Sequence, residues 1–267
     1  MAKSISNPAL VPLSSRIFAI ARYTVLEAWR NRSGILLIAM VVIAFLASIF
    51  VRQQAITESA RMQTAFLASV LRVGAVFIIA ITVLQGSVRE FNDKVLELML
   101  SLDLPRAAYL VGKFLGYALL SVVCAIVVAL PLLFLSEPLH VIKWASVLVL
   151  ELWIVTALAL FCITTFSQLL PAAAFVISFY LLARSISAIK LISHSTLVEP
   201  GLASDFAAWL ASAIALVLPR LDAFTQTAWL VDATAQPLTL VAAILQTGIY
   251  VLLLLFAAMF DLNRRNF

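Results

Sequence analysis

The sequence predicts an all-α, polytopic membrane protein. About 64% of its 267 residues are hydrophobic and only 12% are charged, and the mean hydropathy is +1.11. A soluble domain carries about 25% charged residues. The apolar residues also gather in runs long enough to cross a bilayer. Because a bilayer core offers no partner to an unpaired backbone group, each run must form a helix.

Six runs reach, or nearly reach, the roughly 20 apolar residues that a helix needs to cross the hydrocarbon. We expect one transmembrane domain over 34–267, with spans at about 34–51, 66–86, 107–135, 144–166, 171–190 and 239–260. Residues 1–33 form a charged leader that is too long for a usual cleavable signal.

The end of the leader, "SRIFAIARYTVLEAWRNR" (15–32), has apolar residues at helical spacing, among them Ile17, Ile20 and Thr24. A basic amphipathic helix beside a span usually lies in the membrane interface. We therefore expect a surface helix over this stretch, with Trp29 as an interfacial anchor.

Lys and Arg predict the orientation. With the N-terminus inside, the inner segments hold 11 of the 18 basic residues and the outer segments hold five, while Arg72 and Arg184 fall inside spans. This bias predicts a protein of the cell inner membrane with both termini on the cytoplasmic side.

The largest external element is expected over 191–238. Within it, 204–219 is apolar for only about 14 residues, roughly 21 Å as a helix, which is too short to span. We expect a helix capped by Ser204, lying at the outer face and stopped by Pro219. The alternative makes 204–219 half of a re-entrant pair.

A polar segment separates the second and third spans. A helix over 88–104 would carry one apolar stripe, with charged residues at helical spacing beside it, including Glu90 four residues before Lys94. Pro105 ends this helix and opens the next one. In that next span, Gly112 and Gly116 form a small face that allows close helix packing. The pattern alone suits both a solvated loop helix and a docking helix for a soluble partner.

The run "REFNDKVLELMLSLDLPRAAYLVGKFLG" (89–116) closely resembles the cytoplasmic loop of ABC-exporter permeases of the type-2 family, although family members often carry Pro at the position of Asp103. The helix before the first span is similar to the family's elbow helix. The six spans, and "VLPRLDAF" (217–224) in the last external stretch, also resemble the family's layout. The matching residues of the loop are Glu90, Lys94, Leu96, Glu97, Leu98, Leu100, Ser101, Arg106, Tyr109, Leu110, Gly112 and Lys113.

This resemblance implies a permease that works as a homodimer, each copy paired with a separate ATP-binding subunit that carries ATP and Mg. The chain itself has no P-loop motif, so no cofactor and no enzymatic activity are expected on it. The contact with the ATP-binding subunit would involve Arg89, Glu90, Phe91, Asp93, Lys94, Glu97, Leu98, Ser101 and Arg106.

The layout looks most like permeases associated with copper-enzyme maturation, although few His and Met residues lie outside the spans. The substrate stays open. An intramembrane enzyme and a membrane scaffold or channel that does not use ATP are the alternative functions. The net charge of +5 is explained by topology, so nucleic acid is not an expected partner.

Arg72, Glu151 and Arg184 fall well inside the spans, whereas Lys113, near the start of the third span, is counted with the inner segments. Counted from the outer ends, their depths are roughly 9, 10 and 9 Å. Buried charges usually face one another or a polar cavity. The residues could form a structural ion pair, line a path for an anionic or amphipathic substrate, or snorkel to the outer interface.

The remaining reactive side chains do not form a recognisable site. Cys124 and Cys162 lie in apolar runs, where they are small core residues. His140 and His194 lack the repeated spacing of metal ligands. We find no metal-binding or catalytic motif.

Overall fold

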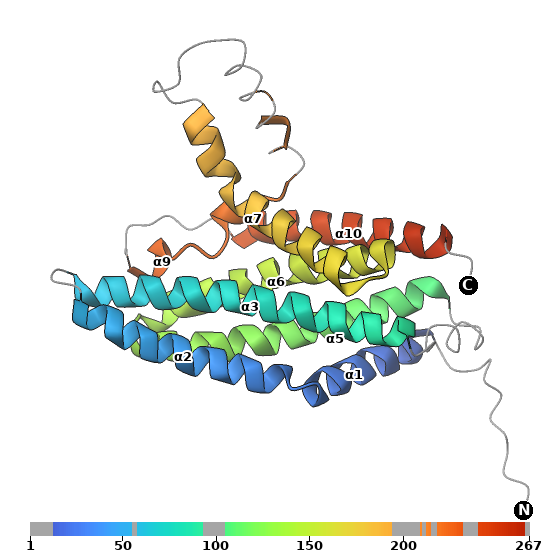
Figure 1. Cartoon of the computed structure of the whole chain (residues 1–267), viewed down its shortest axis with the longest axis horizontal. Helices are drawn as coiled ribbons and strands as arrows, with labels where there is room; N and C mark the ends of the chain where they lie inside the picture. The colour runs from blue at the N-terminus through green and yellow to red at the C-terminus, as the bar shows by residue number, and fades with distance from the viewer. Residues whose placement is uncertain are drawn as a thin grey trace, which may run out of the picture.

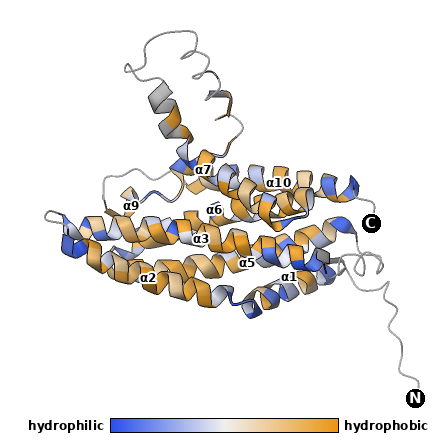
Figure 2. Cartoon of the chain, viewed as in Figure 1, coloured by the Kyte–Doolittle hydropathy of each residue, from blue (hydrophilic) through white to orange (hydrophobic). Residues whose placement is uncertain are grey.

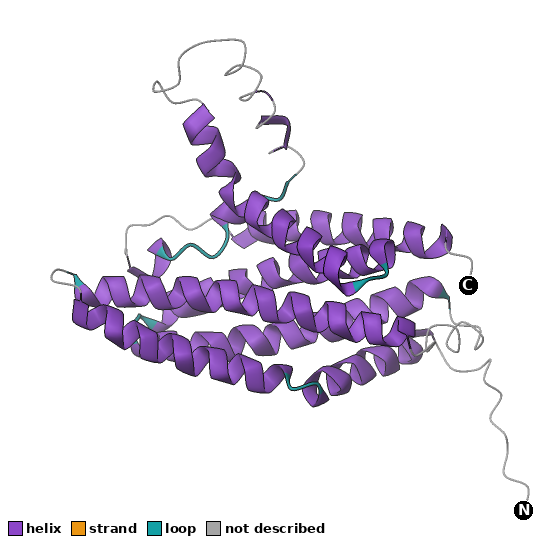
Figure 3. Cartoon of the chain, viewed as in Figure 1, coloured by secondary structure: helices purple, strands orange, loops and turns teal. Residues whose placement is uncertain are grey.

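The computed structural model describes residues 13–54, 58–92, 105–193, 218–231 and 240–264, together with Trp209 and 212–214. These residues form helices and short irregular links, and no strand occurs among them (Figure 3). Six helices are long and apolar enough to cross a membrane, which confirms the all-α, six-span prediction. The elements are α1 (Leu13–Arg30), α2 (Ser33–Gln54), α3 (Ser59–Asn92), α5 (Arg106–Ala129) with the 3-10 turn η2 (Leu130–Phe134), α6 (Pro138–Phe166), α7 (Leu169–Ser193), η3 (Leu221–Ala223), α9 (Ala228–Val231) and α10 (Leu240–Arg264) (Figure 1).

The bundle is arranged around α6, which contacts α3, α5, α7 and α10. Its fully buried side chains include Trp144, Leu148 and Leu152. α2 and α10 lie at the periphery and expose large apolar side chains such as Leu46 and Phe256. Figure 2 shows the same apolar colouring along the outer helices as within the bundle. An apolar exterior is what a lipid environment requires.

α3 is much longer than a bilayer crossing. At 1.5 Å per residue, the 22 residues of α2 cover about 33 Å, close to the hydrocarbon thickness, whereas the 34 residues of α3 cover about 51 Å. The start of α2 lies level with Thr82, since Ser33 and Thr82 line one cavity. α3 therefore continues for ten residues, about 15 Å, beyond the level where α2 begins.

α1 packs along the first turns of α5 at this end of the bundle, which we call the α1 end. A Cβ placed on Gly112 would come within 2.9 Å of Ile20, and one on Gly116 within 2.6 Å of Thr24. The two glycines thus allow α1 to approach closely. The predicted apolar stripe of α1 faces α5, while Phe18 and Trp29 point outward.

Several expected boundaries differ from the structure, and α3 already begins at Ser59 rather than at 66. α3 passes without a break from the predicted second span through residue 88 to Asn92, and residues 93–104 lie outside the described part of the chain. α6 begins at Pro138 rather than 144, because proline fits the first turn of a helix, where its missing N–H costs nothing. Ser204 and most of the predicted 204–219 helix also lie outside the described residues.

Candidate functional site

The first of two buried charge clusters lies at the α1 end. Lys113 projects from the second turn of α5, and its side chain is 2% exposed. Its Nζ atom contacts the carboxylate of Glu90 on α3 and lies 3.6 Å from Oε2 of Glu27 on α1. The Tyr109 hydroxyl donates a hydrogen bond of 2.6 Å to Oε2 of Glu90. We call Glu27, Glu90, Tyr109 and Lys113 the Lys113 cluster.

The Lys113 cluster places one cation between two carboxylates. Burial raises the pKa of Glu27 above its ordinary value of 4.5, while the positive charge of Lys113 acts in the opposite direction. Removing one partner of a buried ion pair is strongly destabilising, because the other charge is left uncompensated. The cluster therefore ties α1, α3 and α5 together.

The cluster also flanks residues 93–104. Glu90 lies two residues before the end of α3, and Tyr109 and Lys113 lie in the first two turns of α5. Arg106, at the start of α5, donates a 2.6 Å hydrogen bond to the carbonyl of Leu262 on α10. The end of α3 and the start of α5, which flank residues 93–104, are thus both joined to neighbouring helices.

The residues predicted to contact an ATP-binding subunit have different surroundings. Arg89 is exposed, and its Nη2 lies 3.5 Å from Oδ1 of Asn31. Glu90 is only 4% exposed, so its carboxylate is occupied by the chain's own Tyr109 and Lys113. Phe91 lies in the last turn of α3. The other predicted residues, apart from Arg106, lie outside the described part of the chain: Asp93, Lys94, Glu97, Leu98 and Ser101.

The second cluster surrounds Glu151, which is fully buried on α6. Its Oε1 accepts a hydrogen bond of 2.9 Å from the Tyr180 hydroxyl and lies 3.4 Å from Nη1 of Arg184. Its Oε2 accepts from the Thr225 hydroxyl at 2.5 Å. Arg72 on α3 donates to the carbonyl of Thr225 at 2.8 Å. We call these five residues the Glu151 cluster.

The structure thus brings Arg72, Glu151 and Arg184 to one place, with Thr225 linking them. Arg184 also donates to the carbonyls of Leu221 and Phe224, at 2.7 and 3.1 Å. The two arginines therefore hold an irregular stretch of backbone, whereas the snorkelling alternative would turn them toward an interface. Backbone without helical hydrogen bonds is tolerated at membrane depth only where it is buried in protein or lines a watery cavity.

The Glu151 cluster lies deeper than the sequence suggested. The helices start and end beyond the predicted span limits, so Arg72 and Glu151 both lie 13 residues, about 20 Å, from the ends of their helices at the far side from α1. Arg184 lies nine residues, about 14 Å, from the end of α7. Residues 218–225 therefore enter the bundle from the far end. α9 leads back toward that end, where the Leu230 carbonyl accepts a hydrogen bond of 3.3 Å from the Ser136 hydroxyl.

Several residues of the two clusters were not identified from the sequence, namely Glu27, Tyr180 and Thr225. Lys113 was counted with the inner loops, although it stands inside an apolar run. A charge within a span usually pairs with an opposite charge at the same depth. The position of Lys113 could therefore have indicated that Glu90 is its partner. Hydropathy gives no comparable signal for Thr225, because its segment reads as an external loop.

The other reactive side chains stay isolated within the described residues. Cys124 and Cys162 are buried free thiols, and Nδ1 of His140 lies 3.9 Å from Glu137 on the same helix. His194 falls outside the described part. Across the ranges described, no group of three or more His, Cys, Asp and Glu side chains could hold a metal ion.

No protein-family model matches the chain, and no curated protein matches it in sequence. The described fold and the two charge clusters are therefore the basis for assigning a function.

Proposed function

We propose that this chain is the permease subunit of an ATP-driven exporter of the ABC type-2 kind, and that it works as a homodimer with a separate ATP-binding subunit on each copy. The observation that carries the proposal is the Lys113 cluster. It joins both flanks of the 93–104 segment to α1, and that segment carries the resemblance to the family's coupling loop.

In this proposal the ATP-binding subunit binds the 93–104 segment from the cytoplasmic side. A displacement of the segment reaches Glu90 at the end of α3 and Lys113 at the start of α5 through the chain itself. The contact of Lys113 with Glu27 then passes the movement to α1. ATP binding would shift the equilibrium between two arrangements of these helices, because packed helices move as rigid units.

The orientation follows from the same proposal. The excess of Lys and Arg supports an orientation in which the α1 end of the bundle lies on the cytoplasmic side of the inner membrane. The Glu151 cluster then lies across the middle of the membrane. Its buried carboxylate and two arginines suit it either to hold residues 218–225 in place or to line the path of an anionic substrate.

The test of the docking surface leaves Glu90 unchanged, because replacing this buried carboxylate would disturb the bundle. We therefore choose the double charge reversal Asp93→Lys with Glu97→Lys, which leaves the Lys113 cluster intact. The tagged chain is purified from native membranes, and co-purifying proteins with a P-loop motif are quantified by mass spectrometry. We expect the double variant to lose its ATP-binding subunit at least tenfold, because repulsion replaces attraction at the contact.

The matched control reverses two exposed carboxylates at the far end of the bundle, Glu58→Lys with Glu137→Lys, whose side chains are 67% and 68% exposed. The control should retain the ATP-binding subunit in full. Equal recovery from the 93/97 variant and the control would reject docking through 93–104. Absence of any ATP-binding subunit from the wild-type preparation would favour the scaffold, channel or enzyme alternatives.

A further inference from the structure

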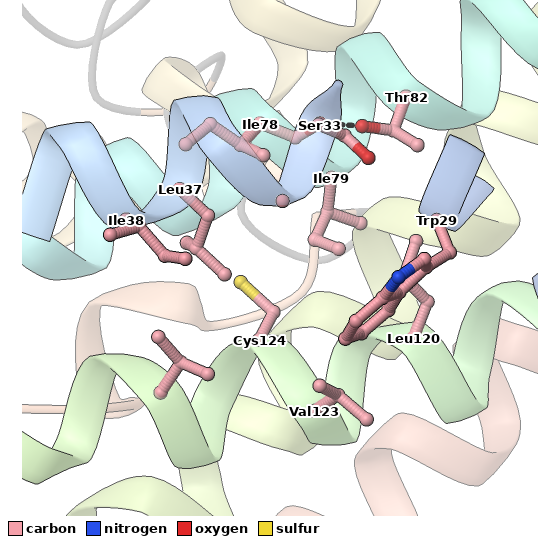
Figure 4. Close-up of a pocket in the computed structure, with 12 residues that line it drawn as sticks. Trp29, Ser33, Leu37, Ile38, Ile78, Ile79, Thr82, Leu120, Val123 and Cys124 are labelled. Atoms are coloured by element: carbon pink, nitrogen blue, oxygen red, sulfur yellow. Dashed lines mark hydrogen bonds between the residues drawn. The ribbon is translucent and has the colours of Figure 1, made fainter. Parts of the chain in front are cut away.

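A small cavity lies where α1 meets α2. Its volume is about 100 Å³, and it is enclosed by the α1–α2 junction, α3 and α5 (Figure 4). Leu37, Ile79 and Val123 contribute to an apolar wall. The hydroxyls of Ser33 and Thr82 are already bonded to backbone carbonyls of Ala28 and Ile78. The cavity therefore favours an apolar occupant. Its volume is several times the roughly 10–15 Å³ that one water-sized group needs, so it can hold a few methylene groups of a hydrocarbon chain.

The mouth of this cavity lies at the membrane interface. α2 is just long enough to cross the hydrocarbon, so its first residue, Ser33, marks the boundary on the α1 side. Trp29 lines the cavity and is 73% exposed. Tryptophan is enriched at this level of a bilayer, where one side of the ring meets lipid and the other meets water.

Three arginines surround the same place. Arg30 and Arg32 flank the α1–α2 turn and are exposed, and Arg89 of α3 reaches Asn31 of that turn. Arg32 adopts a left-handed backbone conformation with φ of 57°, which a residue with a side chain adopts at a cost. The apolar cavity thus has a positively charged rim at headgroup level.

We propose that this cleft binds one anionic phospholipid. The phosphate lies among Arg30, Arg32 and Arg89, and the upper part of an acyl chain enters the cavity beside Trp29. Anionic lipids are attracted to basic residues beside a membrane span, and the apolar cavity adds a site for the chain that a free phosphate could not use. Arg89 is the one residue that this site shares with the expected contact with an ATP-binding subunit.

The test measures lipid binding to the purified full-length chain by native mass spectrometry, titrated separately with phosphatidylglycerol and phosphatidylcholine. We expect one phosphatidylglycerol molecule to bind at least tenfold more tightly than phosphatidylcholine. The double variant Arg30→Gln with Arg32→Gln should weaken phosphatidylglycerol binding about 30-fold, because each arginine near a bilayer surface contributes roughly fivefold. Arg30→Lys with Arg32→Lys should restore most of the binding.

A second pair of variants tests the cavity itself. Gly34 lines the cavity, and a Cβ placed on it meets no atom within 4 Å, so we expect Gly34→Leu to be accommodated and to narrow the cleft. It should weaken binding of both lipids. Gly248→Leu on α10 is the matched control, since Gly248 also has open space around it, and it should leave binding unchanged.

Three outcomes would overturn the proposal. The first is equal affinity for the two lipids, and the second is binding that survives both the glutamine variant and Gly34→Leu. The third is a change in the oligomeric state of Gly34→Leu without a change in lipid binding, which would assign the cleft to a second copy of the chain.

Discussion

The Lys113 and Glu151 clusters both bury charges in an apolar bundle, but their charges meet different partners. Lys113 contacts the carboxylates of Glu90 and Glu27, and these two contacts join α5 to α3 and α1. Arg72 and Arg184 donate instead to main-chain carbonyls of Leu221, Phe224 and Thr225. The first cluster joins long helices, and the second holds the short 3-10 turn η3 and the residues that follow it.

This difference determines how each cluster responds to substitution. A carboxylate that loses its cation can be neutralised by a second substitution, since Glu can be changed to Gln. A carbonyl that loses its donor cannot be altered, because it belongs to the backbone. Buried acceptors without donors cost free energy whatever the side chains around them. Double substitutions should therefore rescue one cluster and not the other.

The largest effect is expected for Lys113→Met. It leaves the buried carboxylate of Glu90 without its cation and should lower the free energy of unfolding by about 3–5 kcal/mol. Adding Glu90→Gln should recover more than half of that loss, because the uncompensated charge is removed. Thermal unfolding in a fixed detergent or lipid mixture measures both. A double variant as unstable as the single one would show that Lys113 stabilises the bundle mainly by packing.

Arg184→Met should have the next largest effect, about 2–3 kcal/mol, since the carbonyls of Leu221 and Phe224 lose a donor and Glu151 loses its nearest cation. Adding Glu151→Gln should recover little, because it does not replace the donor that the carbonyls of Leu221 and Phe224 have lost. Hydrogen exchange over 221–231 should increase in both variants, while exchange in α1 should not. Full recovery in the double variant would mean that Arg184 serves Glu151 alone.

The smallest effect is expected from the titration of Glu27. Its pKa in the folded chain lies above the ordinary 4.5, chiefly because of burial. The folded state therefore binds the proton more readily than the unfolded state, and stability is greatest below pH 4.5 and falls as pH rises through the raised value. Tm of the wild type relative to Glu27→Gln should fall over this range. A difference in Tm that does not change with pH would contradict the assignment.

The sequence predicted those features that depend on one helix at a time. The six spans follow from hydropathy, and the close approach of α1 to Gly112 and Gly116 agrees with the small-residue face that the sequence indicated. The shared depth of Arg72, Glu151 and Arg184 also followed from counting residues, although the helices are longer than the apolar runs and the true depth is greater.

The features that the sequence did not predict depend on side chains from separate elements. Glu90 has a suitable partner four residues away in Lys94, so local spacing concealed its contact with Lys113 in another helix. Thr225 and its neighbours look like a polar external loop, and periodicity cannot tell how deeply an irregular segment enters a bundle. Trp29, Ser33 and Cys124 line one cavity, but nothing in their spacing relates them.

The overhang of α3 sets where a soluble protein could meet this chain. Because α3 runs about 15 Å past the level at which α2 begins, its last residue, Asn92, lies well beyond the hydrocarbon boundary that Ser33 marks. A binding partner there need not strip water from a bilayer surface or tilt against it. The extended helix would thus hold any such partner away from the bilayer surface, so that its binding would depend little on lipid composition.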